Sequence, residues 1–146
     1  MRIDDKIKEI ENYLEELSNI IPENFDKYIK NYEKKAACER YFEKIIEAVV
    51  DVAFLVIKKS QLKMPGDDSI AFSILSENEI ISEDLAEKLK NAKGMRNIIT
   101  HEYGSVDDEL VFNAITEELE KDVAEFLENI KKFLEGISKE NANNKI

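Results

Sequence analysis

Residues 45–57 read Ile45-Ile46-Glu47-Ala48-Val49-Val50-Asp51-Val52-Ala53-Phe54-Leu55-Val56-Ile57, the longest apolar run of this 146-residue chain. The run lies in a helix expected from Glu33 to Lys59, and its apolar side chains point to nearly every face of that helix. A helix that is apolar all round must be buried from more than one side. We therefore expect one side to pack in the core and another to meet a second subunit. The run is too short, and with Glu47 and Asp51 too charged, to span a bilayer.

The rest of the chain predicts further helices joined by short breaks. Apolar residues recur at three- and four-residue spacing from the N-terminus to about residue 21, as in a helix with one buried face. Pro22 ends this helix, because the residue before a proline disfavours the helical conformation. Ser82 is expected to cap a later helix, whose first turn carries Glu83 and Asp84. We expect helices over 4–20, 33–59, 69–75, from 82 onward and from 107 or 108 to 137, with a polar connector over 23–31 and a loop over 64–68.

The composition agrees with a helical protein. Only 4 glycines and 2 prolines interrupt the chain, and no segment has the alternation typical of a strand. We expect an all-α fold, an antiparallel helical bundle of four to five helices, with one domain over residues 1–139 and a frayed polar tail over 140–146. We also expect it to dimerise through the apolar helix over 33–59 and the helix that carries residues 96–103.

Cysteine content and charge restrict the setting and the ligands. The single Cys38 excludes an internal disulfide, and the N-terminus lacks the apolar core of a signal peptide. A cytoplasmic protein without membrane association is therefore expected. With 21 basic and 32 acidic residues, the formal charge of −11 has the wrong sign for broad contact with nucleic acid. Any RNA must be admitted through a local basic pocket.

The only histidine of the chain lies in the stretch Arg96-Asn97-Ile98-Ile99-Thr100-His101-Glu102-Tyr103. Histidine exchanges protons near neutral pH, and arginine offers permanently charged donors that match phosphate oxygens. Together they form a minimal set for cleaving a phosphodiester without a metal ion. On one straight helix, however, Arg96 and His101 would lie about 140° apart, too far to serve one substrate directly.

Two arrangements resolve this separation. The helix could end near Thr100, with Gly104 as the terminating residue, so that His101 leaves the helical path. Alternatively, two copies of the helix could meet across a dimer, each lending residues to a shared cleft. Both arrangements could hold at once.

Simpler roles are open for the same residues. Arg96 could form an ordinary ion pair in so acidic a chain, and Tyr103 could be an aromatic residue at the edge of the core. Glu43, Glu47 and Asp51 are spaced four residues apart, as in a carboxylate metal site, but the helix that carries them has no histidine. We expect no metal and no cofactor. Instead, Asp51 or Glu47 is expected to face the cleft and orient the motif side chains.

The spacing Arg96-x4-His101-x-Tyr103, with Asn97 directly after the arginine, resembles the signature of the HEPN superfamily and, more narrowly, of its HepT-like toxin branch. The segments 38–40, 45–53, 70–81 and 85–107 are similar to that branch as well. The resemblance implies a homodimeric, metal-independent endoribonuclease that acts on RNA, not DNA, as the toxin of a two-gene toxin–antitoxin pair. Its cognate antitoxin would be a minimal nucleotidyltransferase that transfers AMP onto the motif tyrosine. Arg96 and His101 would then be catalytic, Tyr103 the modified residue and Asn97 a supporting residue.

Two other functions stay open. The chain could be a catalytically weak regulator of the same fold that binds a nucleotide or a partner, which the charge of −11 favours. It could also be a helical adaptor in which the motif is coincidental. A nucleotidyltransferase gene beside this one would count against the adaptor, and an RNA cleavage assay would separate the nuclease from the regulator.

Overall fold

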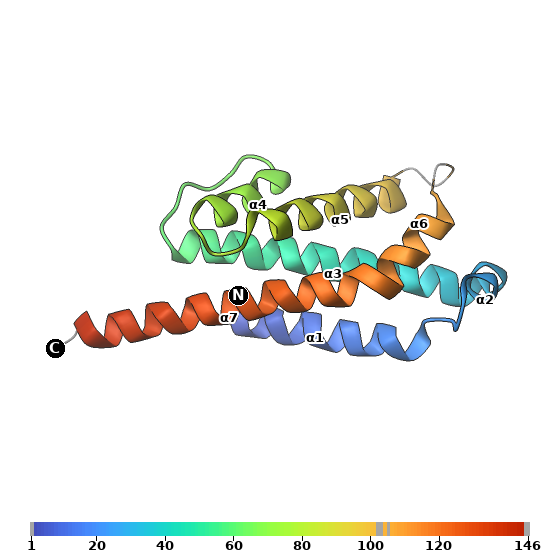
Figure 1. Ribbon diagram of the computed structural model, residues 1–146, viewed down its shortest axis with the longest axis horizontal. Helices are drawn as coiled ribbons and strands as arrows, with labels where there is room; N and C mark the ends of the chain where they lie inside the picture. Colours follow the sequence, from blue (N-terminus) through green and yellow to red (C-terminus); the bar gives the residue numbers. More distant parts are fainter. Residues whose placement is uncertain (1, 102–103, 105, 145–146) are drawn as a thin grey trace.

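The computed structural model describes residues 2–101, 104 and 106–144, and within them all regular structure is helical. The long helices lie alongside one another and α4 covers one end, which confirms the all-α bundle (Figure 1). In chain order the elements are α1 (Ile3–Ile20), α2 (Phe25–Lys30), α3 (Tyr32–Lys59), α4 (Asp68–Glu77), α5 (Glu83–His101), α6 (Asp108–Asn113), a π-helical segment (Ala114–Glu118) and α7 (Leu119–Asn144).

Two asparagines create a helix where we expected a polar connector. The side chain of Asn24 accepts a hydrogen bond from the backbone N–H of Lys27 at 2.9 Å and so caps the start of α2. Asn31 ends α2, and its side chain accepts from the N–H of Lys34 at 3.1 Å, which starts α3. Such caps satisfy N–H groups that a helix start leaves unpaired. The connector prediction was wrong because the asparagines act as caps rather than as loop residues.

The last predicted helix is present but contains an irregular turn and runs further than expected. Within the segment 114–118 the chain adopts a π-helix, in which the N–H of Leu119 bonds to the carbonyl of Ala114, five residues earlier. This wider turn lets α6 bend away from the line of α7 (Figure 1). Helix α7 continues to Asn144, so residues 140–144 are helical where we expected a frayed tail. Gly136 does not stop the helix, and no proline follows it.

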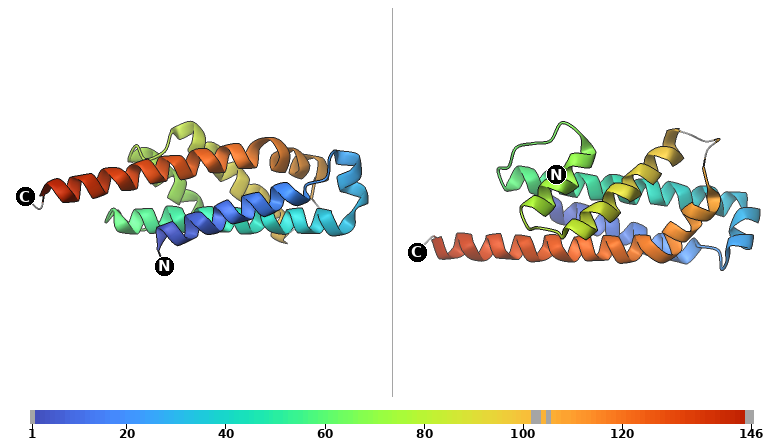
Figure 2. Two further views of the ribbon diagram at one scale, coloured as in Figure 1. Left: turned by 90° about the horizontal axis from the view of Figure 1, so that it is seen from below. Right: turned by 45° about the horizontal axis from the view of Figure 1, so that its top comes forward.

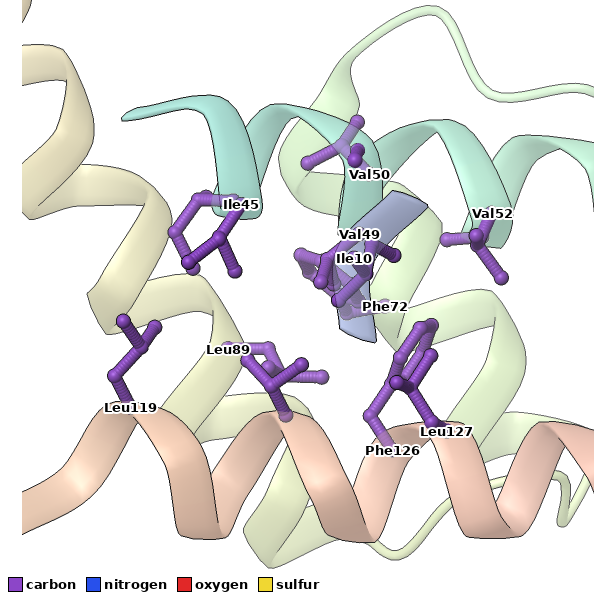
Figure 3. Packing of buried hydrophobic residues seen from close by; sticks show 14 of the residues in the cluster. Ile10, Ile45, Val49, Val50, Val52, Phe72, Leu89, Leu119, Phe126 and Leu127 are labelled. Carbon is purple, nitrogen blue, oxygen red and sulfur yellow. The ribbon is translucent and has the colours of Figure 1, made fainter. Parts of the chain in front are cut away.

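Helix α3 lies at the centre of the bundle, with α1 along one side and α4 and α5 along another (Figures 1 and 2). Figure 3 shows Leu119, Phe126 and Leu127 of α7 pointing towards α3. The buried residues of α3 are Cys38, Phe42, Ile45, Ile46, Ala48, Val49, Val50, Val52, Ala53, Val56 and Ile57. A single chain therefore covers most of this apolar helix. Its composition no longer requires a second subunit, and dimerisation through α3 stays a prediction.

The buried side chains form one continuous cluster across the bundle. Cys38 belongs to it, and burial raises the pKa of its thiol to about 11, which keeps the sulfur protonated and unreactive. Among the described helices, none is long and apolar enough to cross a membrane.

Phe126 tests how much the contact between α7 and the core contributes to stability. Its ring is fully buried and meets that of Phe72 edge-on, with centroids 6.2 Å apart. Phe126→Ala should lower the free energy of unfolding by about 3–5 kcal/mol, because it removes the ring and leaves a cavity. Urea denaturation followed by circular dichroism measures the loss. The control Leu110→Ala, at a side chain 58% exposed, should change stability by less than ~0.5 kcal/mol. Equal losses in the two variants would contradict this account of the core.

Candidate active site

Helix α5 carries most of the candidate catalytic motif and is anchored at both ends. At its start the hydroxyl of Ser82 accepts a hydrogen bond from the N–H of Leu85 at 3.0 Å, as the sequence predicts. Near its end Ile99 is buried in the core. The hydroxyl of Thr100 donates to the carbonyl oxygen of Arg96 at 2.9 Å across the last turn. The motif is therefore held on a packed helix as far as its histidine.

The side chain of Arg96 is 24% exposed and its guanidinium has two polar neighbours. Its Nη1 donates to Oδ1 of Asn97 at 3.2 Å, and its Nη2 lies 3.7 Å from Oε2 of Glu47 on α3. The Nε atom is buried and has no hydrogen-bond partner among the described residues. Since the terminal nitrogens make a single hydrogen bond within the described residues, the guanidinium retains N–H groups that can bind an anion. The expected ion pair and the proposed phosphate contact are thus both compatible with its position.

A cavity of about 320 Å³ opens beside Arg96. Its charged lining consists of Glu47 and Asp51 of α3, Asp68 at the start of α4, and Lys93 and Arg96 of α5. Lys93 lies one turn before Arg96 on the same side of α5, so the cavity presents two cations to a ligand beside three carboxylates. Sequence reasoning missed Lys93, although its three-residue spacing from Arg96 was the available signal.

The two predicted supporting carboxylates lie at this cavity but have different partners. Glu47 contacts Arg96, whereas Oδ2 of Asp51 lies 3.3 Å from Nζ of Lys6 on α1. Burial by itself lowers the pKa of Lys6, but the hydrogen bond to Asp51 and the nearby charge of Glu9 outweigh it and raise that pKa. Asp51 is therefore paired with α1, and Glu47 is the predicted carboxylate that contacts the arginine.

The carboxylates at 43, 47 and 51 do not converge on one point. Glu43 lies 3.4 Å from Arg40, while Glu47 and Asp51 face Arg96 and Lys6. Across the described part of the chain, no group of three histidine, cysteine, aspartate or glutamate side chains is arranged to hold a metal ion.

His101 is exposed and is the last described residue of α5. It follows the helical path rather than leaving it, and the predicted end of the helix near Thr100 is not seen up to this residue. Arg96 and His101 therefore keep their separation of about 140° around the helix axis. The residues on both sides of Gly104 lie outside the described residues, so its terminating role stays a prediction. Tyr103 also lies outside the described residues.

The face of α5 that carries His101 is uncovered in the single chain. Gly94, Ile98 and His101 share this face by helical spacing. Ile98 is 40% exposed, and a Cβ atom added at Gly94 would meet no atom within 4 Å. Nothing within the described residues explains a glycine or an exposed isoleucine here, although glycine in a helix costs about 1 kcal/mol relative to alanine. Close packing of another helix against this face would explain both.

In sequence, the chain is similar to proteins named as nucleases. A family model described as "Ribonuclease HepT-like" matches residues 10–130. A relative named tRNA nuclease HepT, from Aphanizomenon flos-aquae (strain 2012/KM1/D3), is 27% identical over 114 residues, 78% of each chain. Another, named mRNA nuclease HepT, from Shewanella oneidensis, is 30% identical over 89 residues, 61% of this chain and 66% of the relative.

Solved structures show the same fold. A tri-AMPylated Shewanella oneidensis HEPN toxin in complex with MNT antitoxin superposes with a TM-score of 0.83 at 24% identity, over 90% of this chain and 99% of the toxin. A toxin–antitoxin structure with AMP-PNP gives a TM-score of 0.82 at 23% identity, over 89% and 99% of the two chains. The bundle is thus shared along nearly the whole length of these proteins.

Gly94→Ala tests whether the exposed face of α5 is constrained within the single chain. Because the added methyl group has open space, the variant should raise the free energy of unfolding by about 0.5–1 kcal/mol through helix propensity alone. Urea denaturation at low protein concentration measures this gain. Gly136→Ala on α7 is a matched control, since its added Cβ also meets no atom within 4 Å. A destabilised Gly94→Ala beside a stabilised Gly136→Ala would show that the face is already packed.

Proposed function

The chain belongs to the ribonuclease HepT-like family and is a ribonuclease by that membership; we propose that it is a metal-independent endoribonuclease and the toxin of a toxin–antitoxin pair. The observation that carries the proposal is the placement of two groups on one helix. Arg96 lies beside a cavity with unused donor capacity, and the exposed His101 ends the same helix. The nuclease names of the relatives and their toxin–antitoxin complexes support it.

Arg96 would bind the phosphate that is cleaved. Charge builds up on the phosphate oxygens in the transition state, and a preorganised guanidinium stabilises that charge. Asn97 and Glu47 would set the orientation of the guanidinium through the contacts described above. Asp51 would have an indirect role, because it lines the same cavity.

His101 would move the protons of the reaction. As a base, an imidazole removes the proton of the ribose 2′-hydroxyl, whose oxygen then attacks phosphorus. The bond from phosphorus to the 5′-oxygen breaks, and an imidazolium gives that oxygen a proton. The products would be a 2′,3′-cyclic phosphate end and a free 5′-hydroxyl end. One proton leaves the 2′-hydroxyl and one is given to the 5′-oxygen, so the cleavage step needs no further reactant.

A homodimer would unite groups that one chain keeps apart. Arg96 and His101 face different directions around α5, while Gly94 and Ile98 leave the histidine-bearing face open. Packing of two α5 helices through this face would place both histidines next to a shared cleft and cover Ile98. The dimer is thus part of the proposed mechanism, because the site is incomplete without it.

Tyr103 would serve as the switch. A partner nucleotidyltransferase would join the tyrosine oxygen to the α-phosphorus of ATP, with pyrophosphate as the leaving group. The AMP unit would then stand two residues from His101 in the sequence. Its bulk and negative charge would compete with RNA phosphate for the same place. The similar Shewanella oneidensis toxin, which is tri-AMPylated and bound to MNT antitoxin, supports this proposal.

Substitution of the two catalytic groups tests the nuclease. Arg96→Ala and His101→Ala should each lower the rate of RNA cleavage by about 10²–10⁴-fold, and EDTA should leave the unsubstituted protein active. Cleavage of labelled RNA resolved on denaturing gels measures both effects. Arg40→Ala is the matched control, because Arg40 is an exposed arginine on α3 that pairs only with Glu43 among the described residues. Unchanged cleavage by both catalytic variants would refute the mechanism, and no cleavage by the unsubstituted protein would favour the regulator.

Intact mass spectrometry tests the switch. The protein is co-expressed with a minimal nucleotidyltransferase of the kind proposed as its partner, taken from a gene beside its own, and mass increments of AMP are expected. They should vanish in Tyr103→Phe, because the phenol oxygen is the acceptor, and persist in Tyr32→Phe, whose side chain is 80% exposed. Increments that survive Tyr103→Phe would place the modification elsewhere.

A further inference from the structure

A groove lined mainly by basic residues, called the basic groove here, lies between the start of α1, the end of α3 and the C-terminal turns of α7. Figures 1 and 2 show the course of these three helices. The basic groove has a volume of about 1020 Å³. Its charged lining consists of the basic residues Arg2, Lys58, Lys59, Lys131 and Lys139 and the acidic residues Asp4 and Glu135. A chain with a formal charge of −11 thus gathers a local excess of positive charge here.

Three of the four lysines in the basic groove lack the carboxylate partner that neutralises several lysines on other helices. On α2, α5 and α7, carboxylates one turn away neutralise Lys27, Lys88 and Lys132, at 2.6, 3.1 and 3.2 Å. By contrast, residues 52–66 contain three lysines and no carboxylate. Within the described residues, no carboxylate oxygen lies within 4.0 Å of the charged nitrogen of Lys58, Lys59 or Lys139. Of the other two cations, Lys131 pairs with Glu11 at 3.2 Å and Arg2 with Asp5 at 4.0 Å.

Segments outside the family match complete the basic groove. The match covers residues 10–130, whereas Arg2, Lys131 and Lys139 lie beyond it. Lys139 is brought to the groove because α7 continues past the matched region to Asn144. Three of the five cations of the basic groove thus lie outside the segment that the family model matches.

The basic groove is connected to the candidate active site along one side of α3. Glu47, which contacts Arg96, and Lys58, which lines the groove, are eleven residues apart and lie within about 20° of each other around the helix. At 1.5 Å per residue they are about 16 Å apart along the axis. Asp51 and Phe54, which line the cavity beside Arg96, lie between them on the same side.

We infer that the basic groove binds phosphates of the RNA substrate at a distance from the bond that is cleaved. The inference rests on the proposed nuclease function and adds to it the surface that holds the substrate. A polyanion that places one phosphate at Arg96 can follow this side of α3 and reach the lysines at its end. Such contacts release counterions and offset the repulsion of an acidic protein surface. RNA too short to span both places would bind weakly.

Charge reversal in the basic groove tests the inference by binding rather than by cleavage. In a His101→Ala background, which keeps the RNA intact, Lys58→Glu/Lys59→Glu should raise the Kd for a labelled tRNA transcript about tenfold. The slope of log Kd against log salt should fall by roughly 0.7 for each phosphate that the protein no longer binds. Fluorescence anisotropy at several salt concentrations measures both quantities.

The control is Lys27→Glu/Lys30→Glu in the same background. It reverses two exposed lysines on α2 and changes the net charge equally, so a general field effect would weaken binding alike in both variants. The inference would be overturned by an equal loss of RNA affinity in both variants, by no loss in the groove variant, or by no detectable binding of RNA. Binding of poly-glutamate at Lys58 and Lys59 without binding of RNA would overturn it in favour of an acidic protein partner. Thermal melts check the fold, and Lys58→Gln/Lys59→Gln should give an intermediate loss.

These outcomes separate the inference from the proposed function. RNA that binds through the basic groove but is never cut by the unsubstituted protein would refute the nuclease mechanism alone. If the unsubstituted protein cleaves RNA normally but the groove variant binds RNA as well as its control does, the inference about the basic groove alone is refuted.

Discussion

The need to bury α3 determines the rest of this structure. A helix that carries apolar side chains on nearly all its faces has to be surrounded, and a chain of 146 residues has just enough further helix to do so. Helix α1 covers one side, α4 and α5 cover another, and α7 contributes the large side chains seen in Figure 3. The exposed remainder of α3 is the stripe that includes Glu47 and Lys58. That stripe is also where the arginine cavity and the basic groove occur.

The same packing explains why α5 can hold the proposed catalytic groups in place. Buried residues fix this helix against the core, so the side chains on its other faces have defined positions. A rigid helix, however, also fixes the angle between its residues. Arg96 and His101 cannot turn towards each other without unwinding the last turn, and that turn is intact through His101. The rigidity that orients the arginine is what makes a second subunit necessary in the proposed mechanism.

Sequence reasoning predicted the elements that depend on local periodicity and capping. The ends of α1 and α3, the loop before α4 and the Ser82 cap all follow from such signals. It missed α2, because two asparagines that look like loop residues act as caps, and the π-helical turn, because that turn depends on how α6 and α7 meet the core. The contact between Glu47 and Arg96 was anticipated as one of two options, but Lys93 was not, since cavities form between helices distant in sequence.

Charge distribution, rather than net charge, determines whether an acidic protein can hold RNA. Several lysines here, among them Lys27, Lys88 and Lys132, are neutralised by a carboxylate one helical turn away. Cations such as Lys58 and Lys59, which have no carboxylate one turn away in the sequence, keep their charge available. Beside Arg96 the charges only balance: Arg96 and Lys93 face the carboxylates of Glu47, Asp51 and Asp68, and Asp51 is already paired with Lys6. A pocket without a surplus of positive charge repels RNA once one or a few phosphates are attached nearby. The proposed inhibition by AMP on Tyr103 therefore follows from the same scarcity of free cations that makes a distant basic groove useful for holding the substrate.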